Sequence, residues 1–176
     1  MRCVFDQQTI AARVAAMGRE ISRDYHGRDL LLVGILKGAF VFLADLVRAL
    51  SLPVEVDFIR VASYGSATTS SGTCTVTKDL EADPAGRDVL LVEDIADSGR
   101  TLAFLVERLR ARGARSVAAC VLIDKTERRE RDLDLAYTGF IVPAGFLVGY
   151  GLDYAERYRH LPAIYALEPG EDAVTA

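Results

Sequence analysis

The segment from Val92 to Leu102, Val-Glu-Asp-Ile-Ala-Asp-Ser-Gly-Arg-Thr-Leu, concentrates side chains that could do chemistry. Residues Ser98 to Thr101 lead directly into a helix-forming stretch, so they offer successive backbone N–H groups, two hydroxyls and the positive end of a helix dipole to an anion. Two adjacent carboxylates, Glu93 and Asp94, would repel an anion, but they can accept hydrogen bonds from the vicinal hydroxyls of a ribose, directly or through a metal ion. The segment therefore predicts a site for a ribose phosphate.

A second interpretation of the same segment needs no ligand. Asp, Ser and Gly are common capping residues before a helix, so Asp94 and Asp97 could simply cap the helix that follows, with Glu93 as a solvated strand end. The residue types alone leave both interpretations open.

The elements around this segment place it where a parallel sheet binds its ligands. The apolar run Asp88–Asp94 predicts a strand ending in acids, Thr101–Arg112 predicts a helix closed by Gly113, and Ser116–Ile123 predicts a further buried strand. The strand–helix–strand order implies a parallel sheet with right-handed crossovers. Ligands of such sheets bind beyond the carboxyl ends of the strands.

The rest of the chain predicts more helices and strands of the same kind. Apolar residues recur at helical spacing in two stretches, whereas short apolar or alternating runs predict strands. The predicted helices are Thr9–Tyr25 and Ala39–Leu50, and the predicted strands are Leu30–Leu36, Val54–Val61, Tyr137–Val142 and Phe146–Tyr150. The small, polar segment Ser63–Gly72 predicts a mobile loop or a two-stranded excursion, and the acidic tail 168–176 is expected to be flexible.

Length, composition and charge limit the classes of protein that fit. With 176 residues, of which 51% are hydrophobic and 26% charged, the chain suits one α/β domain, residues 1–176, with a sheet buried on both faces. A net charge of −4 argues against a protein whose main task is binding nucleic acid. The three cysteines are odd in number and widely spaced, so they predict free thiols. The sequence shows neither the apolar core of a signal peptide nor a run long enough to span a bilayer, which predicts a cytoplasmic protein without membrane contact.

The segment Val92–Leu102 resembles the phosphoribosyl-pyrophosphate-binding motif of type I phosphoribosyltransferases, in which two acids are followed by an Asp and a Ser/Thr-Gly-x-Thr loop. Across the rest of the chain the resemblance narrows to the bacterial hypoxanthine and hypoxanthine-guanine phosphoribosyltransferases. Four further segments carry it in the expected order: Gly34–Phe40, Asp57–Leu80, Leu122–Arg129 and Phe146–Arg159.

This resemblance implies a fold and a reaction. The fold is a central, mainly parallel sheet flanked by helices, with a small hood and a flexible lid at about residues 63–78. The reaction is Mg²⁺-dependent purine salvage, in which N9 of hypoxanthine or guanine attacks phosphoribosyl pyrophosphate, giving IMP or GMP and pyrophosphate. The resemblance also implies a homodimer or homotetramer.

The resemblance implies a role for each matched position at the two phosphate ends of the site. Contacts with ribose and its 5′-phosphate are implied for Glu93, Asp94, Ser98, Gly99, Arg100, Thr101 and Leu102. Pyrophosphate contacts are implied for Lys37, Gly38 and Arg159, with a cis peptide bond between Leu36 and Lys37. Metal contacts are implied for Glu93, Asp94 and Asp153.

At the base end, the resemblance makes Asp97 the general base near N7 and Lys125 the donor to O6 of the purine. Phe146 would stack on the base, and the carbonyls of Leu147 and Asp153 would face its 2-position. Ser63 and Tyr64 would belong to the lid. Taken alone, Lys125 in its charged run would be a solvated lysine, and Phe146 would be plain core. Ala39 stands where the family has a second glycine, which puts the dihedral angles of the pyrophosphate loop in question.

Other functions remain as alternatives. A nucleotide-sensing RNA-binding regulator on the same fold would need a basic face, which the intermixed, net acidic charges do not favour. A ligand-binding module without turnover is disfavoured because Asp97, Lys125, Asp153 and Arg159 are all retained. An enzyme of the same class that prefers xanthine would differ in the pocket around Leu147 and Asp153, which the sequence does not resolve. Neither His26 nor His160 has an acid or nucleophile spaced for a catalytic triad.

Overall fold

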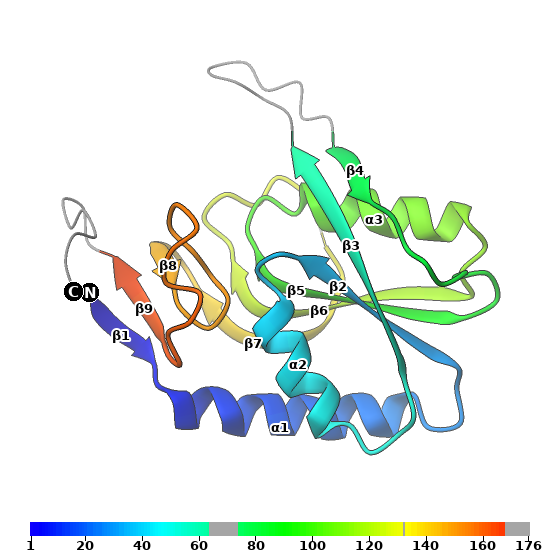
Figure 1. Cartoon of the computed structure of the whole chain (residues 1–176), viewed down its shortest axis with the longest axis horizontal. Helices are drawn as coiled ribbons and strands as arrows, with labels where there is room; N and C mark the ends of the chain where they lie inside the picture. Colours follow the sequence, from blue (N-terminus) through cyan, green and yellow to red (C-terminus); the bar gives the residue numbers. More distant parts are fainter. Residues whose placement is uncertain (64–73, 132, 168–176) are drawn as a thin grey trace.

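A six-stranded sheet forms the centre of the protein (Figure 1). The computed structural model describes residues 1–63, 74–131 and 133–167. The strand order is β4-β3-β2-β5-β6-β7, and every neighbouring pair is parallel except β3 and β4. The strands are β2 (Leu30–Leu36), β3 (Glu55–Ser63), β4 (Cys74–Lys78), β5 (Asp88–Ala96), β6 (Ser116–Lys125) and β7 (Leu135–Val142). The predicted mainly parallel sheet is confirmed.

Helices cover both faces of this sheet. α1 (Gln7–Asp24) and α2 (Phe40–Ala49) pack on one face, and α3 (Arg100–Ala111) packs on the other (Figure 1). Successive residues of β2 point to opposite sides, so Leu30 and Leu32 join the core under α1 and α2 while Leu31 and Val33 join the core under α3. A strand buried on both faces requires the continuous apolar run that predicted it.

A second, smaller sheet lies at one end of the molecule (Figure 1) and forms the hood. It consists of β1 (Arg2–Phe5), β9 (Ile164–Leu167) and β8 (Phe146–Val148), paired antiparallel in that order. The ring of Phe5 stacks on Phe140 of β7 with centroids 4.0 Å apart, which ties the small sheet to the large one. The sequence did not predict β1, β4 or β9, whereas the still shorter β8 was predicted as part of the apolar run Phe146–Tyr150.

Local side-chain and backbone chemistry explains where two elements differ from their predicted bounds. α1 begins two residues early because the Asp6 carboxylate accepts a hydrogen bond from Thr9 N at 2.7 Å and caps the helix. β8 ends at Val148, two residues before the predicted end. The φ angles of Gly149 and Tyr150 are +95° and +51°, and these left-handed conformations cannot continue a strand.

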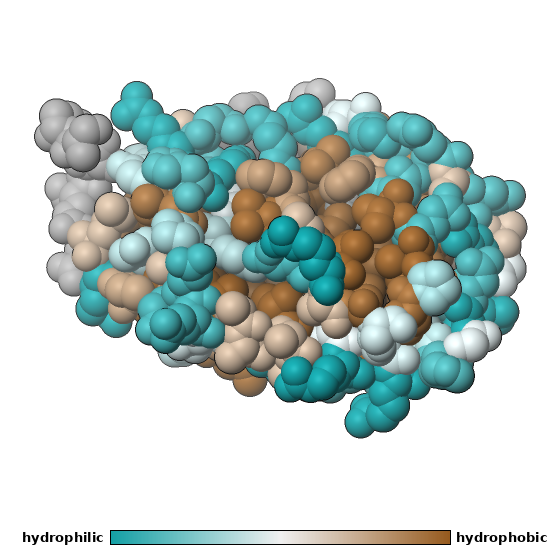
Figure 2. Space-filling view, turned by 60° about the horizontal axis from the view of Figure 1, so that its bottom comes forward, coloured by the Kyte–Doolittle hydropathy of each residue, from teal (hydrophilic) through white to brown (hydrophobic). Residues whose placement is uncertain are grey.

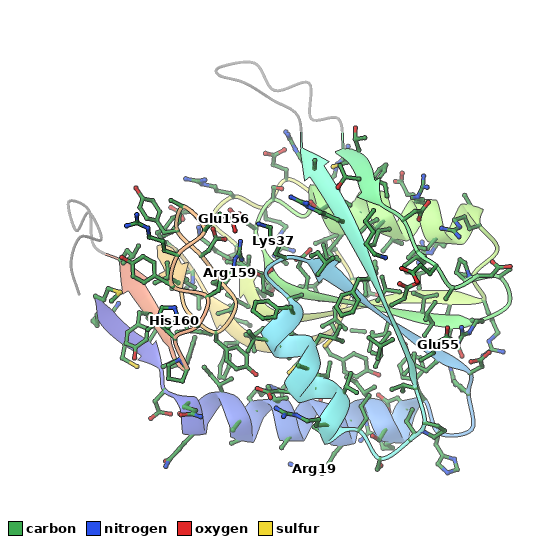
Figure 3. All side chains as sticks on the ribbon, in the orientation of Figure 1. Arg19, Lys37, Glu55, Glu156, Arg159 and His160 are labelled. Carbon is green, nitrogen blue, oxygen red and sulfur yellow. The ribbon has the colours of Figure 1, made fainter. Side chains whose placement is uncertain are left out.

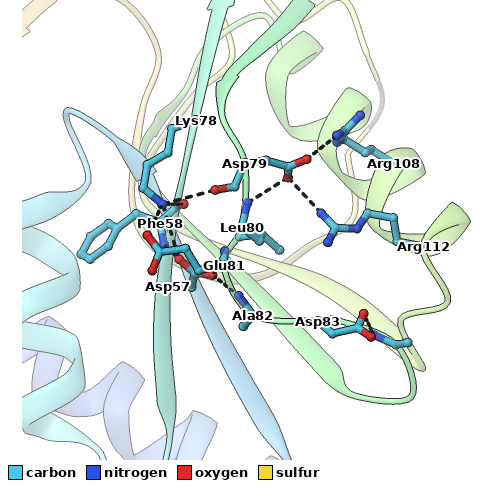
Figure 4. Close-up of polar contacts among 11 residues, drawn as sticks. Asp57, Phe58, Lys78, Asp79, Leu80, Glu81, Ala82, Asp83, Arg108 and Arg112 are labelled. Carbon is cyan, nitrogen blue, oxygen red and sulfur yellow. Dashed lines mark hydrogen bonds and ion pairs between the residues drawn. The ribbon is translucent and has the colours of Figure 1, made fainter.

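The base of the β3–β4 pair is held by a set of polar contacts (Figure 4). The buried carboxylate of Asp57 accepts hydrogen bonds from the backbone N–H groups of Glu81 and Ala82 at 2.7 and 2.9 Å. Asp79, which follows β4, pairs with Arg108 and Arg112 of α3 at 2.6 and 2.9 Å. These contacts fix the chain that leaves β4 to both β3 and α3.

Two predictions fall wholly or partly outside the described residues. Of the predicted lid, Ser63 is the last residue of β3 and residues 74–78 form β4, whereas Tyr64 lies in the undescribed segment 64–73. The predicted tail, residues 168–176, is also undescribed. None of the described helices has the length and apolar character that crossing a membrane requires.

Candidate active site

Three loops that follow β2, β5 and β6 meet at one edge of the sheet, because these neighbouring strands are parallel and end on the same side. A fourth segment, residues 149–159 from the region of the small sheet, joins them there. Lys37, Glu156 and Arg159 mark this meeting point in Figure 3, where the end of β2 faces the 149–159 segment. The predicted site residues lie in these four segments or in the strand ends and the helix start beside them, apart from Phe146 and Leu147 of β8 and the lid residues Ser63 and Tyr64.

The two adjacent acids of β5 are buried. Glu93 is 9% exposed and Asp94 is 7% exposed. Burial raises the pKa of Glu93 well above its usual range, and the charge of neighbouring Asp94 raises the Glu93 pKa further. Burial also raises the pKa of Asp94. The interpretation of Glu93 as a solvated strand end is therefore wrong, because β5 continues to Ala96 and carries both acids inside the sheet.

The loop before α3 presents first-turn backbone donors, of which Arg100 N makes a long hydrogen bond to Ser98 Oγ at 3.4 Å. Gly99 is the N-cap residue with a φ of +81°, and no side chain caps the helix. The first turn runs to Leu102, and the first intrahelical bond is donated by Ala103 N to Gly99 O at 3.0 Å. Asp94 and Asp97 do not cap α3, so the capping interpretation is wrong. The geometry matches an anion site at a helix N-terminus.

One residue of the predicted phosphate motif differs from the others. The side chain of Leu102 is 2% exposed and packs in the core under α3. It therefore offers a ligand only its backbone N–H in the first turn of the helix.

Lys125, the last residue of β6, and Asp97, in the loop after β5, lie together. Lys125 Nζ is 4.0 Å from Asp97 Oδ1 and 3.5 Å from Glu127 Oε2. The lysine is only 7% exposed, so its interpretation as a solvated residue of a charged run is wrong. Asp97 Oδ1 is buried and has no hydrogen-bond partner among the described residues. A buried carboxylate oxygen without a donor is left ready to accept a hydrogen bond from a ligand.

Phe146 is an exposed residue, which makes its interpretation as plain core wrong. Half of its surface is accessible, and its ring meets that of Tyr154 edge to face with centroids 5.5 Å apart. The next residue of β8, Leu147, points the opposite way and is 6% exposed. Phe146 thus presents an open ring face, while Leu147 anchors the strand in the core.

Arg159 is held in place by residues of its own segment, 149–159. Its guanidinium donates to Gly151 O at 2.7 Å and pairs with Asp153 Oδ1 at 2.8 Å. Gly151 in turn lies directly against the loop after β2, because a Cβ placed on it would be 2.2 Å from Gly38 O. The segment that carries Arg159 is therefore packed directly against Lys37-Gly38.

The loop after β2 reaches β5 in the same way. A Cβ on Gly38 would be 1.7 Å from Asp94 Oδ2, so only glycine fits there. The peptide bond between Leu36 and Lys37 is cis, as the resemblance implied. Ala39 has a φ of −70° and a ψ of −7°, which any residue adopts, so the family glycine that it replaces is not needed for its backbone conformation.

Sequence reasoning missed two charged residues that organise the site. Arg129 donates to the carbonyl of Ala96 at 3.1 Å and pairs with Asp124, so it ties the end of β5 to that of β6. Glu156 pairs with Lys37 at 2.8 Å across 119 residues of sequence. The one available signal was local, since Glu156 is three residues from both Asp153 and Arg159.

The predicted metal ligands do not form a ready-made cation site. Among residues 1–63, 74–131 and 133–167, no three His, Cys, Asp or Glu side chains gather closely enough to hold a metal ion. Glu93, Asp94 and Asp153 therefore do not form one group. The donor chemistry of the buried pair still suits Mg²⁺, which commonly takes one or two carboxylates and completes its shell with substrate phosphates and water.

Comparisons with known proteins agree with this geometry. Residues 3–155 match the model of the phosphoribosyl transferase domain. The hypoxanthine-guanine phosphoribosyltransferase of Mycobacterium avium is 49% identical, over 92% of this chain and 83% of its own length. The structure of a hypoxanthine phosphoribosyltransferase from Staphylococcus aureus superposes with a TM-score of 0.92 at 38% identity, covering 96% of this chain and 92% of the other. A hypoxanthine phosphoribosyl transferase structure from Trypanosoma cruzi, which concerns the role of its C-terminal region in oligomeric state and activity, gives a TM-score of 0.90 at 37% identity, covering 96% of this chain and 92% of the other.

Proposed function

The chain belongs to the phosphoribosyl transferase family. We propose that it works in purine salvage and that its site has three parts, one for each portion of the substrates. It transfers the 5-phosphoribosyl group of phosphoribosyl pyrophosphate to N9 of hypoxanthine or guanine and releases pyrophosphate. The observation that carries this proposal is the placement of buried Lys125 4.0 Å from the half-buried Asp97, beside the N-terminus of α3.

The first part holds the ribose 5-phosphate. The phosphate accepts hydrogen bonds from the first-turn N–H groups of α3 and from the hydroxyls of Ser98 and Thr101. Glu93 and Asp94 accept from the ribose hydroxyls. Burial raises the pKa of both acids, and the charge of Asp94 raises that of Glu93 further, so donors from the sugar or a nearby cation would stabilise their charged forms. The carboxylates of Glu93 and Asp94 are therefore stabilised when the ribose hydroxyls bind.

The second part holds the base. Lys125 donates to O6 of the purine, Phe146 stacks on its ring, and the carbonyls of Leu147 and Asp153 accept from a 2-amino group. Asp97 accepts the N7 proton as the lone pair of N9 bonds to the ribose, and the electron pair of the N7–H bond stays on the ring. The role is supported by Asp97 Oδ1, a buried atom that has no hydrogen-bond partner among the described residues.

The third part holds pyrophosphate. Lys37, the backbone of Gly38 and the guanidinium of Arg159 supply positive charge and N–H donors for the leaving group. Glu93, Asp94 or Asp153 would help to hold Mg²⁺, which would supply further positive charge for the departing oxygens. The cations would stabilise the negative charge that develops on the departing pyrophosphate, and Glu93 and Asp94 would stabilise the positive charge that develops on the ribose.

A spectrophotometric assay tests the function directly. Purified protein is mixed with phosphoribosyl pyrophosphate, Mg²⁺ and, in turn, hypoxanthine, guanine, xanthine or adenine. Nucleotide formation with hypoxanthine or guanine is expected, and failure with every oxopurine would overturn the proposed reaction. Turnover of xanthine above that of hypoxanthine would instead assign the alternative substrate.

Lys125→Met is expected to lower kcat/KM for hypoxanthine roughly 10- to 100-fold, because a hydrogen bond from a charged donor is worth about 1.5 to 3 kcal/mol. The preference for hypoxanthine over adenine should shrink as well, since the donor that opposes the adenine amino group is gone. Arg23→Met is the control, because it also removes a cation and Arg23 lies in the last turn of α1, where its guanidinium pairs with Asp24 at 2.8 Å. An unchanged preference in Lys125→Met would remove Lys125 from base selection.

We further propose that the protein forms a homodimer or homotetramer. A cleft lined mainly by apolar residues runs between α1, α2 and the chain after Arg159, with Phe40, at 45% exposure, at its edge. Figure 2 shows apolar side chains gathered on the face that carries α1 and α2. Sedimentation equilibrium should give a mass of two or four times 19.2 kDa, and a monomer at micromolar concentration would contradict the proposal.

We propose the cytoplasm as the compartment. Cys3, Cys74 and Cys120 are all free thiols. Free cysteines persist where the surroundings are reducing.

A further inference from the structure

A carboxylate lies between the two cations of the pyrophosphate part of the site. Glu156 Oε2 is 2.8 Å from Lys37 Nζ and 3.5 Å from the Arg159 guanidinium. Figure 3 shows the three residues together, Lys37 from the end of β2 and the other two from the 149–159 segment. Nothing in the proposed reaction gives Glu156 a task.

The two cations depend on Glu156 to different degrees. Arg159 is already paired with Asp153 and bonded to Gly151 O, so its longer contact with Glu156 is additional. Among the described residues, Glu156 is the only acid that pairs with Lys37. The hydrogen bond from Lys37 also holds the pKa of Glu156 below its usual range, so the carboxylate is charged at neutral pH. Glu156 therefore neutralises Lys37 in the free protein.

The backbone around Glu156 is fixed, whereas its side chain is not enclosed. Ala155, Glu156 and Tyr158 have φ angles of +50°, +64° and +75°, which non-glycine residues adopt only when their surroundings enforce it. Glu156 N donates to Asp153 Oδ2 at 2.9 Å, which holds the turn. The Glu156 side chain is 63% exposed. Its carboxylate can therefore swing away from Lys37 by side-chain rotation while the turn stays in place.

We propose that Glu156 is an internal counter-ion of the pyrophosphate site, which occupies the place of a leaving-group phosphate in the free protein and is displaced when the pyrophosphate group binds. This inference rests on the proposed function of Lys37 and Arg159. A single carboxylate held by exposed ion pairs is a weak competitor for a polyanion that binds a guanidinium through two oxygens. Glu156 would thus moderate the affinity for pyrophosphate and favour its release after reaction.

Glu156→Gln tests the inference, because the amide keeps the size of the side chain and removes its charge. Isothermal titration of the intact protein with pyrophosphate and Mg²⁺ should show a Kd roughly 2- to 10-fold lower than that of the unaltered protein, the range expected for losing one or two exposed ion pairs. The KM for phosphoribosyl pyrophosphate should fall in parallel, whereas the KM for hypoxanthine should stay the same. High salt should reduce the difference.

Two further variants make the result decisive. Glu55→Gln is the matched control, because Glu55 also pairs with an arginine, Arg87 at 2.6 Å, but lies at the opposite end of β3 from the site (Figure 3). It should leave the Kd for pyrophosphate unchanged. Glu156→Asp keeps the charge but shortens the side chain, so it should also tighten pyrophosphate binding if contact with Lys37 is what competes.

Two outcomes would overturn the inference. An unchanged Kd in Glu156→Gln would show that the carboxylate does not compete, and a higher Kd would show that it orients the cations for the ligand. Failure of the proposed function would look different, since the unaltered protein would then neither bind pyrophosphate nor form nucleotide.

Discussion

Asp97→Asn is expected to lower kcat with hypoxanthine about 10²- to 10⁴-fold, the range that a positioned general base contributes. Asparagine has nearly the same shape but cannot accept the N7 proton. Asp97 Oδ1 has no donor among the described residues and is 4.0 Å from Lys125 Nζ, so the substitution removes a charge that no structural hydrogen bond depends on. The dissociation constant for phosphoribosyl pyrophosphate should change little, because the loop from Ser98 onward holds the phosphate.

Single-turnover kinetics combined with equilibrium binding separates the possible roles of Asp97. A loss confined to the chemical step supports the role of general base. An equal loss in affinity for the purine and in turnover would make Asp97 an anionic anchor for the base instead, and an unaffected rate would remove it from the reaction. Asp83→Asn is the control for changing an aspartate to an asparagine. Asp83 lies in an exposed loop, where its carboxylate accepts a hydrogen bond from Ala85 N at 3.1 Å.

Gly38→Ala is expected to lower kcat/KM roughly 100-fold, because displacing a reacting group by about 1 Å can have an effect of that size. The added methyl carbon would be 1.7 Å from Asp94 Oδ2 and 2.4 Å from its Cγ, so Asp94 or the loop after β2 has to move. Either movement separates the ribose-binding carboxylates from the pyrophosphate loop. The KM for phosphoribosyl pyrophosphate should rise more than that for hypoxanthine.

The control for this substitution is Gly86→Ala. Gly86 has a φ of +73° and nothing within 4 Å of an added Cβ, so the change strains the backbone far from the site without a collision. It should lower the thermal midpoint slightly and leave kcat/KM unchanged. If Gly38→Ala retained the kcat/KM of the unaltered protein, the close approach of Gly38 to Asp94 would have no part in catalysis.

The elements that the sequence predicted best are those whose signal is local. β2 has the bounds that its apolar run predicted, since residues 30 to 33 and Ile35 alternate between the two cores. The pairing of β1 with β9 could not be predicted, because it joins residues about 160 positions apart, such as Arg2 and Ala166, through strands of only four residues. Short strands are identified by their partners rather than by their own pattern.

The same distinction applies to the site. The anion loop and its two acids follow from residue type and order along one segment. Lys125 and Phe146 could be singled out only through the family resemblance, because alone each had a more ordinary interpretation. The contacts of Glu156 with Lys37 and of Gly38 with Asp94 depend on how distant segments pack together, so they cannot be predicted from spacing along the chain.

The loop that precedes α3 and the strand end that carries Lys125 form one rigid unit. Arg129 bonds the carbonyls of Ala96 and Lys125, and the N–H groups of Glu130 and Arg131 both donate to Ser98 O, at 3.0 and 3.2 Å. These bonds fix the distance between the N-terminus of α3 and Lys125 in the free protein. In the proposed roles, with the 5′-phosphate on α3 and O6 on Lys125, a purine joined to ribose through N7 would carry its O6 at a different distance from the phosphate. The fixed distance would then favour the N9-linked product over the N7-linked isomer.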